Sequence, residues 1–136
     1  MGRETYIDYR LWRDGTMIDI NDSLTPFPDG VSIRIPDKSI EYWKGGELHR
    51  EDGPSLIERN GDQYWNINGI HHRDNGPATV RVDGDRFWFK NGKGHREDGP
   101  AIIRGDGTLE WKLFGQKLTE EQWIKRMTNE QKGRTL

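Results

Sequence analysis

The chain has 136 residues, with 21 Lys and Arg against 23 Asp and Glu and a formal net charge of −2. This near balance argues against binding to long nucleic acid by phosphate neutralisation, and the lack of cysteine excludes disulfides, thiol nucleophiles and thiolate metal sites. No apolar run approaches the roughly 20 residues that a membrane span needs, and the first residues lack the basic and then apolar pattern of a secretion signal. The sequence predicts one soluble cytoplasmic domain with no membrane contact, covering residues 1–136.

The sequence of residues 1–27 indicates a degenerate copy of the repeat found in the residues that follow. Trp12-Arg-Asp-Gly15 has the same Trp-x-x-Gly spacing as Trp43 to Gly46. A longer loop rich in proline and serine comes after it. Because the terminal unit of a repeat protein must face water, we interpret this region as an N-terminal cap.

Residues 28–118 contain a repeat of 23 residues. The sequence His-Arg-(Glu/Asp)-(Asp/Asn)-Gly-Pro begins at His49, His72 and His95. A fixed period of this size indicates that one small structural unit has been copied. Upstream of His49 the sequence matches the repeat less closely, since Pro28-Asp29-Gly30 is followed by Val31 where proline is expected.

The middle copy indicates that each unit is a β-hairpin. Asp83-Gly84 separates two runs of β-branched and aromatic residues, which is the strongest short-range hairpin signal. Asn91-Gly92 offers a second tight turn. A two-residue loop at Asp83-Gly84 predicts these opposed pairs: Val82 and Asp85, Arg81 and Arg86, Val80 and Phe87, Thr79 and Trp88, Ala78 and Phe89.

The same register predicts a row of tryptophans along one face. Trp65, Trp88 and Trp111 share one repeat position, and Leu56, Thr79 and Ile102 would lie opposite them. We interpret this row as core. The predicted fold is mainly β, an elongated single-layer antiparallel sheet of tandem hairpin repeats of about 23 residues each, closed by a C-terminal α-helix.

Residues 119–131 predict the closing helix. Thr119-Glu-Glu-Gln122 is a capping box, and Trp123, Ile124 and Met127 follow at helical spacing. We expect a helix from about Glu120 to Glu130, which ends before Gly133 with a frayed tail after Lys132. The three apolar side chains should bury against the last hairpin and cover a sheet edge or face.

The pattern aromatic-x-x-x-Gly-x-x-His-x-x-x-Gly, followed by Asp-Gly and the next aromatic, resembles MORN-type hairpin repeats. The His-Arg-x-Asp-Gly-Pro-Ala motif is similar to a repeat in small accessory proteins of tailed bacteriophages. The segment Gly115-Gln-Lys-Leu-Thr-Glu-Glu121 resembles the segment before the C-terminal helix of those proteins. The resemblance covers about residues 28–127. It implies a binding platform in the host cytoplasm that inhibits a host defence factor, such as a CRISPR–Cas component.

The recurrent polar residues have a structural and a chemical interpretation. A metal held by His49, His72 and His95, with His71 as a fourth ligand, conflicts with a spacing of about 10 Å between copies and metal–ligand distances of about 2 Å. We therefore expect no metal site, and histidines that pack on a neighbouring ring or turn and hydrogen-bond locally. Asp52 and Asp98 are interpreted as turn formers, because the middle copy carries an amide there, which cannot act as a general base.

The arginines of the motif, Arg50, Arg73 and Arg96, leave two alternatives open. Each guanidinium can stack on a tryptophan or bond to its own turn carboxylate, or the column of Arg and His can grip an acidic surface or a phosphate. Residues that differ between copies are candidates for specificity. The predicted partner-binding residues are Tyr42, Tyr64, His71, Arg73, Arg81, Arg86, Phe87, Phe89 and Arg96.

No nucleophile elbow, phosphate loop or catalytic triad pattern is present in the sequence. The sequence therefore predicts a non-enzymatic protein-binding module with no cofactor, and a host protein as partner. Two alternatives stay open, a protein that sequesters a small nucleotide signal and a structural or assembly protein that forms homodimers through a sheet edge.

Overall fold

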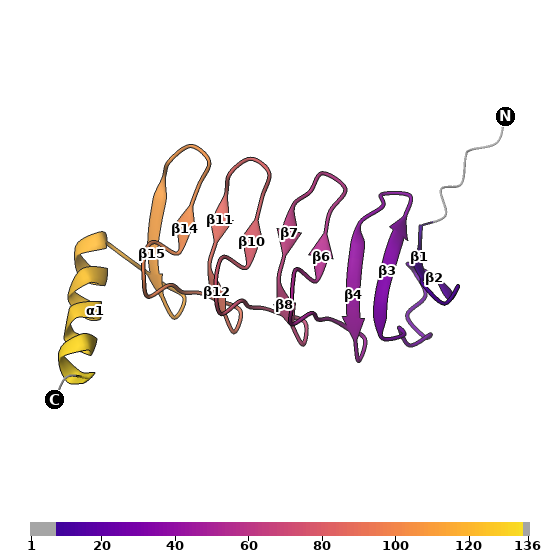
Figure 1. The fold of residues 1–136 in the computed structure, drawn as a ribbon, viewed down its shortest axis with the longest axis horizontal. Helices are drawn as coiled ribbons and strands as arrows, with labels where there is room; N and C mark the ends of the chain where they lie inside the picture. Colours follow the sequence, from indigo (N-terminus) through magenta and orange to yellow (C-terminus); the bar gives the residue numbers. More distant parts are fainter. Residues whose placement is uncertain (1–7, 135–136) are drawn as a thin grey trace. The chain divides into compact units, whose positions relative to one another are not determined.

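The computed structural model describes residues 8–134, and the side chains of residues 8–129. The chain is mainly β: many short antiparallel strands form an open sheet, and one helix follows at the C-terminal end (Figure 1). The predicted mainly β class with a C-terminal helix is therefore confirmed. It divides into two compact units, Met1–Ile70 and His71–Leu136. No helix in the described part is long and apolar enough to cross a membrane.

The first unit is a six-stranded antiparallel sheet in the order β2-β1-β3-β4-β6-β7, with the short strand β5 paired to β4. β8 (Asn66–Ile67) and β9 (Ile70–His71) follow at the junction of the two units. The six strands are β1 (Tyr9–Trp12), β2 (Met17–Asp19), β3 (Gly30–Ile35), β4 (Ile40–Lys44), β6 (Leu56–Ile57) and β7 (Gln63–Tyr64), and the additional strand β5 is Glu47–Leu48.

The second unit has five strands in the order β10-β11-β14-β15-β16, followed by the helix α1 (Glu120–Arg134). A separate two-stranded ribbon, β12 (Phe89–Lys90) with β13 (Lys93–Gly94), extends from the β10–β11 hairpin. The strands of the sheet are β10 (Thr79–Val80), β11 (Arg86–Phe87), β14 (Ile102–Ile103), β15 (Leu109–Leu113) and β16 (Gln116–Leu118).

The predicted two-residue loop at Asp83-Gly84 is wrong. Thr79 pairs with Phe87, and the Arg81 N–H donates to the Asp85 carbonyl at 3.0 Å, so residues 82–84 form a three-residue loop. Gly84 takes φ +101°, the left-handed residue that ends this type of hairpin loop. The Asp83 carboxylate accepts the Asp85 N–H at 2.9 Å, and this local bond stabilises the longer turn.

A register shift of one residue replaces every predicted cross-strand neighbour. Leu56 lies opposite Tyr64, Thr79 opposite Phe87 and Ile102 opposite Glu110, so the predicted tryptophan pairs are wrong. Instead the chain leaves the sheet at the tryptophan position in the middle copy. The Trp88 N–H donates to the carbonyl of Ala101, the residue just before β14, while the Trp88 carbonyl accepts the N–H of His95, the residue just after β13.

This departure at Trp88 separates two predicted site residues. Phe87 lies in β11 and Phe89 in β12, which pair with different strands, so the two rings do not share one sheet face as predicted. Asn91-Gly92 forms the predicted second tight turn, with φ of 50° and 78°.

The N-terminal cap contains the same three-residue loop as the later copies. The Trp12 N–H donates to the Thr16 carbonyl, with Gly15 at φ +93°. Trp12 to Gly15 therefore corresponds to the Asp83-Gly84 turn. The predicted correspondence with Trp43 to Gly46 is wrong, because that segment makes a two-residue turn through Gly45 and Gly46.

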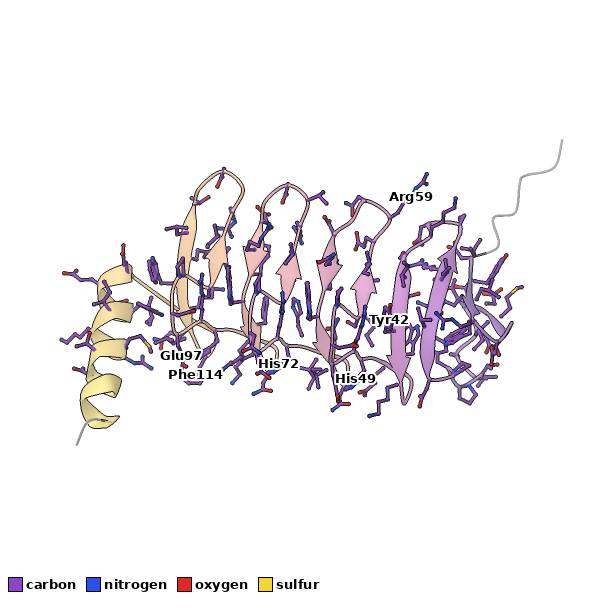
Figure 2. All side chains as sticks on the ribbon, viewed as in Figure 1. Tyr42, His49, Arg59, His72, Glu97 and Phe114 are labelled. Carbon is purple, nitrogen blue, oxygen red and sulfur yellow. The ribbon has the colours of Figure 1, made fainter. Side chains whose placement is uncertain are left out.

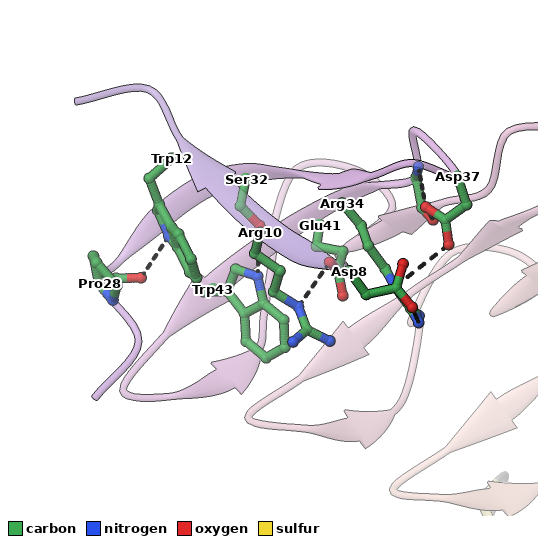
Figure 3. A network of polar contacts seen from close by, with 10 residues as sticks. Asp8, Arg10, Trp12, Pro28, Ser32, Arg34, Asp37, Glu41 and Trp43 are labelled. Carbon is green, nitrogen blue, oxygen red and sulfur yellow. Dashed lines mark hydrogen bonds and ion pairs between the residues drawn. The ribbon is translucent and has the colours of Figure 1, made fainter. Parts of the chain in front are cut away.

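The loop before β3 covers one face of the first unit's sheet. The Phe27 ring packs between Trp12 and Trp43, with ring centroids 5.5 and 4.8 Å apart, and Trp12 Nε1 donates to the Pro28 carbonyl (Figure 3). On the same face Arg10 forms an ion pair with Glu41. This face is the core of the unit, and the opposite face has no such cover among the described residues.

The helix begins as predicted and ends later. Thr119 Oγ1 accepts the Gln122 N–H, and Gln122 Oε1 accepts the Thr119 N–H, which confirms the capping box. Trp123 packs on Trp111 at 4.8 Å, whereas Ile124 is 49% exposed, so its predicted burial is wrong. The helix runs to Arg134 and includes Gly133, because a glycine costs a helix only about 1 kcal/mol and no proline stops it.

Candidate functional site

The three motif histidines each contact the backbone of a turn in the repeat, and Figure 2 labels two of them, His49 and His72. In each copy Nδ1 accepts a backbone N–H 19 residues further on, at 2.9 Å, from Asn68, Asn91 or Phe114. Nε2 faces the carboxylate two residues on, at 3.4 Å in His49, 2.9 Å in His72 and 3.5 Å in His95. Because Nδ1 accepts, the proton of the neutral ring is assigned to Nε2. The prediction that these rings hydrogen-bond locally is confirmed.

The motif arginines hold the loop that follows them. Arg50 Nε donates to Asp52 at 3.0 Å and Arg96 Nε to Asp98 at 2.8 Å. In all three copies Nη1 donates to the carbonyl of the proline four residues on, at 3.0–3.2 Å. Arg50 also lies 4.0 Å from the Tyr42 ring centroid, and Arg96 lies 3.9 Å from that of Trp88. Arg96 therefore makes the predicted contact with a tryptophan, while Arg50 lies over a tyrosine instead. Both bond to the predicted turn carboxylate.

The motif glycine allows the loop to close on the arginine. A Cβ at Gly53, Gly76 or Gly99 would lie 2.7–2.9 Å from the guanidinium carbon of its own copy. That is closer than van der Waals contact, so a side chain there would displace the arginine. Every recurrent residue of His-Arg-x-x-Gly-Pro thus has a contact within its own scaffold.

Two of the predicted site residues, Arg73 and Arg96, come together at a polar cleft in the second unit. The cleft measures about 630 Å³ and is also lined by Trp88, Lys90 and the acidic residues of the two motif loops. We call it the loop cleft. Burial lowers the pKa of the Arg73 guanidinium. The cleft carries charges of both signs, and its walls are turn segments.

His71 and Phe89 form a second cluster in that unit. Their rings stack at 4.4 Å, and His71 Nε2 lies 2.8 Å from both the Ala78 carbonyl and Thr79 Oγ1. Burial lowers the pKa of His71, and the hydrogen bond to Ala78 opposes this in part. The neutral imidazole is therefore favoured here.

Arg81, Arg86 and Phe87 lie around the β10–β11 hairpin. Arg81 is 5.3 Å from the Phe87 ring centroid and 4.0 Å from Asp85. Arg86 Nη1 donates to the carbonyls of Arg81 and Asp85 at 3.3 and 3.1 Å. Phe87 is half-buried, so it does not form an open aromatic face with Phe89.

The two predicted tyrosines belong to the first unit. The Tyr64 carbonyl accepts the Ser55 N–H at 2.8 Å, and the side chain is half-buried. Tyr42 lies under Arg50, as described above, and it also lines an apolar hollow. These two tyrosines thus have different surroundings.

This hollow on the first unit is a site that the sequence did not predict. It measures about 990 Å³ and lies over β1, β3 and β4, on the face opposite Phe27. The register places Leu11 beside Ile33 and Ile33 beside Ile40, and Ile33 is 43% exposed. We call it the sheet hollow, lined by Leu11, Val31, Ile33, Ile40 and Tyr42. Alternating apolar residues in 30–35 and 40–44 were a signal for it.

The opposite face of the same sheet, which the loop before β3 covers, contains a buried carboxylate. Glu41 is 5% exposed, and Arg10 Nε donates to it at 3.0 Å (Figure 3). Burial raises the pKa of Glu41, and the charge of Arg10 opposes this. Arg10 also lies 5.2 and 5.3 Å from the rings of Phe27 and Trp43, which places the ion pair inside the core.

Among the described residues no group of three or more His, Asp or Glu side chains is arranged to hold a metal ion. No protein family model matches the chain, and no curated protein or solved structure is significantly similar to it. The arrangement of side chains is therefore the basis for a functional proposal.

Proposed function

We propose that this chain is a non-enzymatic protein-binding module, a phage accessory protein that binds and inhibits a host defence protein such as a CRISPR–Cas component. The elongated single-layer platform and the likeness to MORN-type repeats belong to the same proposal. The observation that supports protein binding most directly is the sheet hollow.

The sheet hollow has the composition of a protein interface. Its floor is aliphatic, with Tyr42 at one side, while Arg13, Asp14 and Asp29 line the same space. Protein interfaces combine an apolar centre with a polar rim, and tyrosine is enriched in them. Exposed apolar patches on soluble proteins mark interaction sites. The host partner is expected to place an apolar segment on this floor.

The experiment is a pull-down from bacterial lysate with the full chain as bait. Wild type should recover a stoichiometric partner, and Ile33→Asp should weaken capture by about tenfold or more, because an unpaired charge would be buried in the interface. Leu24→Asp is the matched control, since Leu24 is 92% exposed in the same unit but outside the hollow. Absence of a stoichiometric partner at every salt concentration, or equal capture by Ile33→Asp, would contradict the proposal.

A second candidate function is sequestration of a small nucleotide. The loop cleft is lined by three cationic side chains, Arg73, Lys90 and Arg96, and by the ring of Trp88. Cationic side chains bind phosphate groups and an aromatic ring can stack on a nucleobase, so this combination favours a nucleotide as ligand. A nucleotide bound there would raise the melting temperature by mass action. A thermal shift assay against a nucleotide panel separates this function from protein binding.

A further inference from the structure

Four Asn-Gly pairs occur in the chain: Asn60-Gly61, Asn68-Gly69, Asn75-Gly76 and Asn91-Gly92. In such a pair the backbone nitrogen of the glycine can attack the side-chain amide carbon of the asparagine. Glycine permits this most readily because it has no Cβ to hinder the approach. The attack requires that the glycine N–H is available.

Three of the four glycine N–H groups are engaged. Gly61 donates to the Glu58 carbonyl at 2.9 Å, Gly69 to the Leu48 carbonyl at 2.8 Å and Gly92 to the His71 carbonyl at 2.8 Å. Neither the Gly76 N–H nor the Asn75 side chain has a hydrogen-bond partner among the described backbone (residues 8–134) and side chains (residues 8–129), and Asn75 is exposed. The Asn75-Gly76 pair is therefore the only one of the four with both reacting groups available.

A permanent positive charge lies beside this peptide bond. A Cβ on Gly76 would be 2.9 Å from Arg73 Cζ and 3.0 Å from Arg73 Nη1, so the guanidinium lies against the Gly76 backbone. Arginine stays protonated in proteins. Its charge favours the deprotonated Gly76 nitrogen and the oxyanion that forms at the Asn75 amide carbon.

We propose that Asn75 is a site of spontaneous deamidation. The Gly76 nitrogen loses its proton and bonds to Asn75 Cγ, the bond from Cγ to the side-chain nitrogen breaks, and ammonia leaves with a proton from solvent. Water then opens the resulting succinimide. Attack at Cγ gives aspartate, and attack at the backbone carbonyl gives isoaspartate.

The product changes the loop cleft, which Asn75 lines. Aspartate at this position makes the middle copy match its neighbours, where Asp52 and Asp98 accept from Arg50 and Arg96. The formal net charge of the chain changes from −2 to −3, one unit per event. The charge of the cleft thus depends on the age of the protein, whatever binds there.

The test is peptide mapping by mass spectrometry of the folded full chain, incubated at mildly alkaline pH and sampled over time. The Asn75 peptide should gain the mass of one deamidation about tenfold faster than the Asn60, Asn68 and Asn91 peptides, whose glycine N–H must first break its hydrogen bond. In urea the four rates should converge. Equal rates in the folded chain, or a slower rate at Asn75, would overturn the proposal.

Two variants refine the test. Asn75→Gln should abolish the early mass gain, which excludes a neighbouring residue as its source. Arg73→Gln should slow the reaction at Asn75, with unchanged slow rates at Asn68 and Asn91 as the sign that the chain is folded. An unchanged rate at Asn75 in that variant would overturn the role of Arg73.

Discussion

At the residue scale, the recurrent motif forms a set of contacts that close a loop. The histidine accepts a turn N–H, the arginine bonds to the proline carbonyl, and the glycine leaves room for the arginine. A carboxylate two residues after the arginine completes the set in two of the copies, through Asp52 and Asp98. Recurrence in this chain therefore reports how the loop is built.

Replacing Arg96 with lysine tests the geometric part of this account. An ammonium cannot make the parallel contacts of a guanidinium to Asp98, the Pro100 carbonyl and the Trp88 ring. We expect Arg96→Lys to lower the free energy of unfolding by about 1 kcal/mol. Urea denaturation measures this, with the exposed helix residue Arg126 changed to lysine as control. Equal stability of the two variants would contradict the account.

His71 predicts a pH dependence of stability. Burial lowers its pKa below the usual 6.5, so the unfolded chain binds the proton more readily than the folded chain. The contribution to stability is complete above pH 6.5 and is lost as the pH falls through the folded-state pKa. His71→Gln should remove this component. A stability difference between wild type and variant that does not change with pH would show that His71 is not protected.

At the element scale, the turns decide the register. The sequence predicts the hairpin at Asp83-Gly84, the tight turn at Asn91-Gly92 and the capping box at Thr119, and all three are present. The predicted two-residue loop length at Asp83-Gly84 is wrong, because Asp-Gly suits both two-residue and three-residue loops. The difference of one residue in loop length changes the cross-strand partner of every residue in the hairpin.

A substitution at Gly105 tests the packing between two neighbouring hairpin turns. A Cβ at Gly105 would overlap the Asp83 carbonyl oxygen, and the Gly105 N–H donates to the Asp85 carboxylate at 2.8 Å. Because backbone cannot move aside as a flexible side chain does, Gly105→Ala should cost about 2 kcal/mol or more. Gly94→Ala is the matched control, since its Cβ would meet the Lys112 side chain, 2.8 Å from Cδ. Thermal unfolding compares them, and an equal loss would refute this view of the turn.

At the scale of the whole molecule, the candidate sites are harder to derive from the sequence than the fold. The loop cleft follows from the repeat, since Arg73 and Arg96 occupy one position in successive copies. The sheet hollow does not, because it needs the pairing of Leu11, Ile33 and Ile40 from three strands. Local periodicity shows which residues share a strand face, and only the observed register shows which strands are neighbours.

The claim that the copied motif is scaffold is tested most directly by the tautomers of its histidines. Long-range proton–nitrogen NMR correlation of the folded chain near neutral pH distinguishes Nδ1–H from Nε2–H rings. The structure predicts that His49, His72 and His95 all carry the proton on Nε2, because Nδ1 of each accepts a backbone N–H. Rings that are Nδ1-protonated, or that exchange between tautomers as in an unfolded chain, would contradict this account.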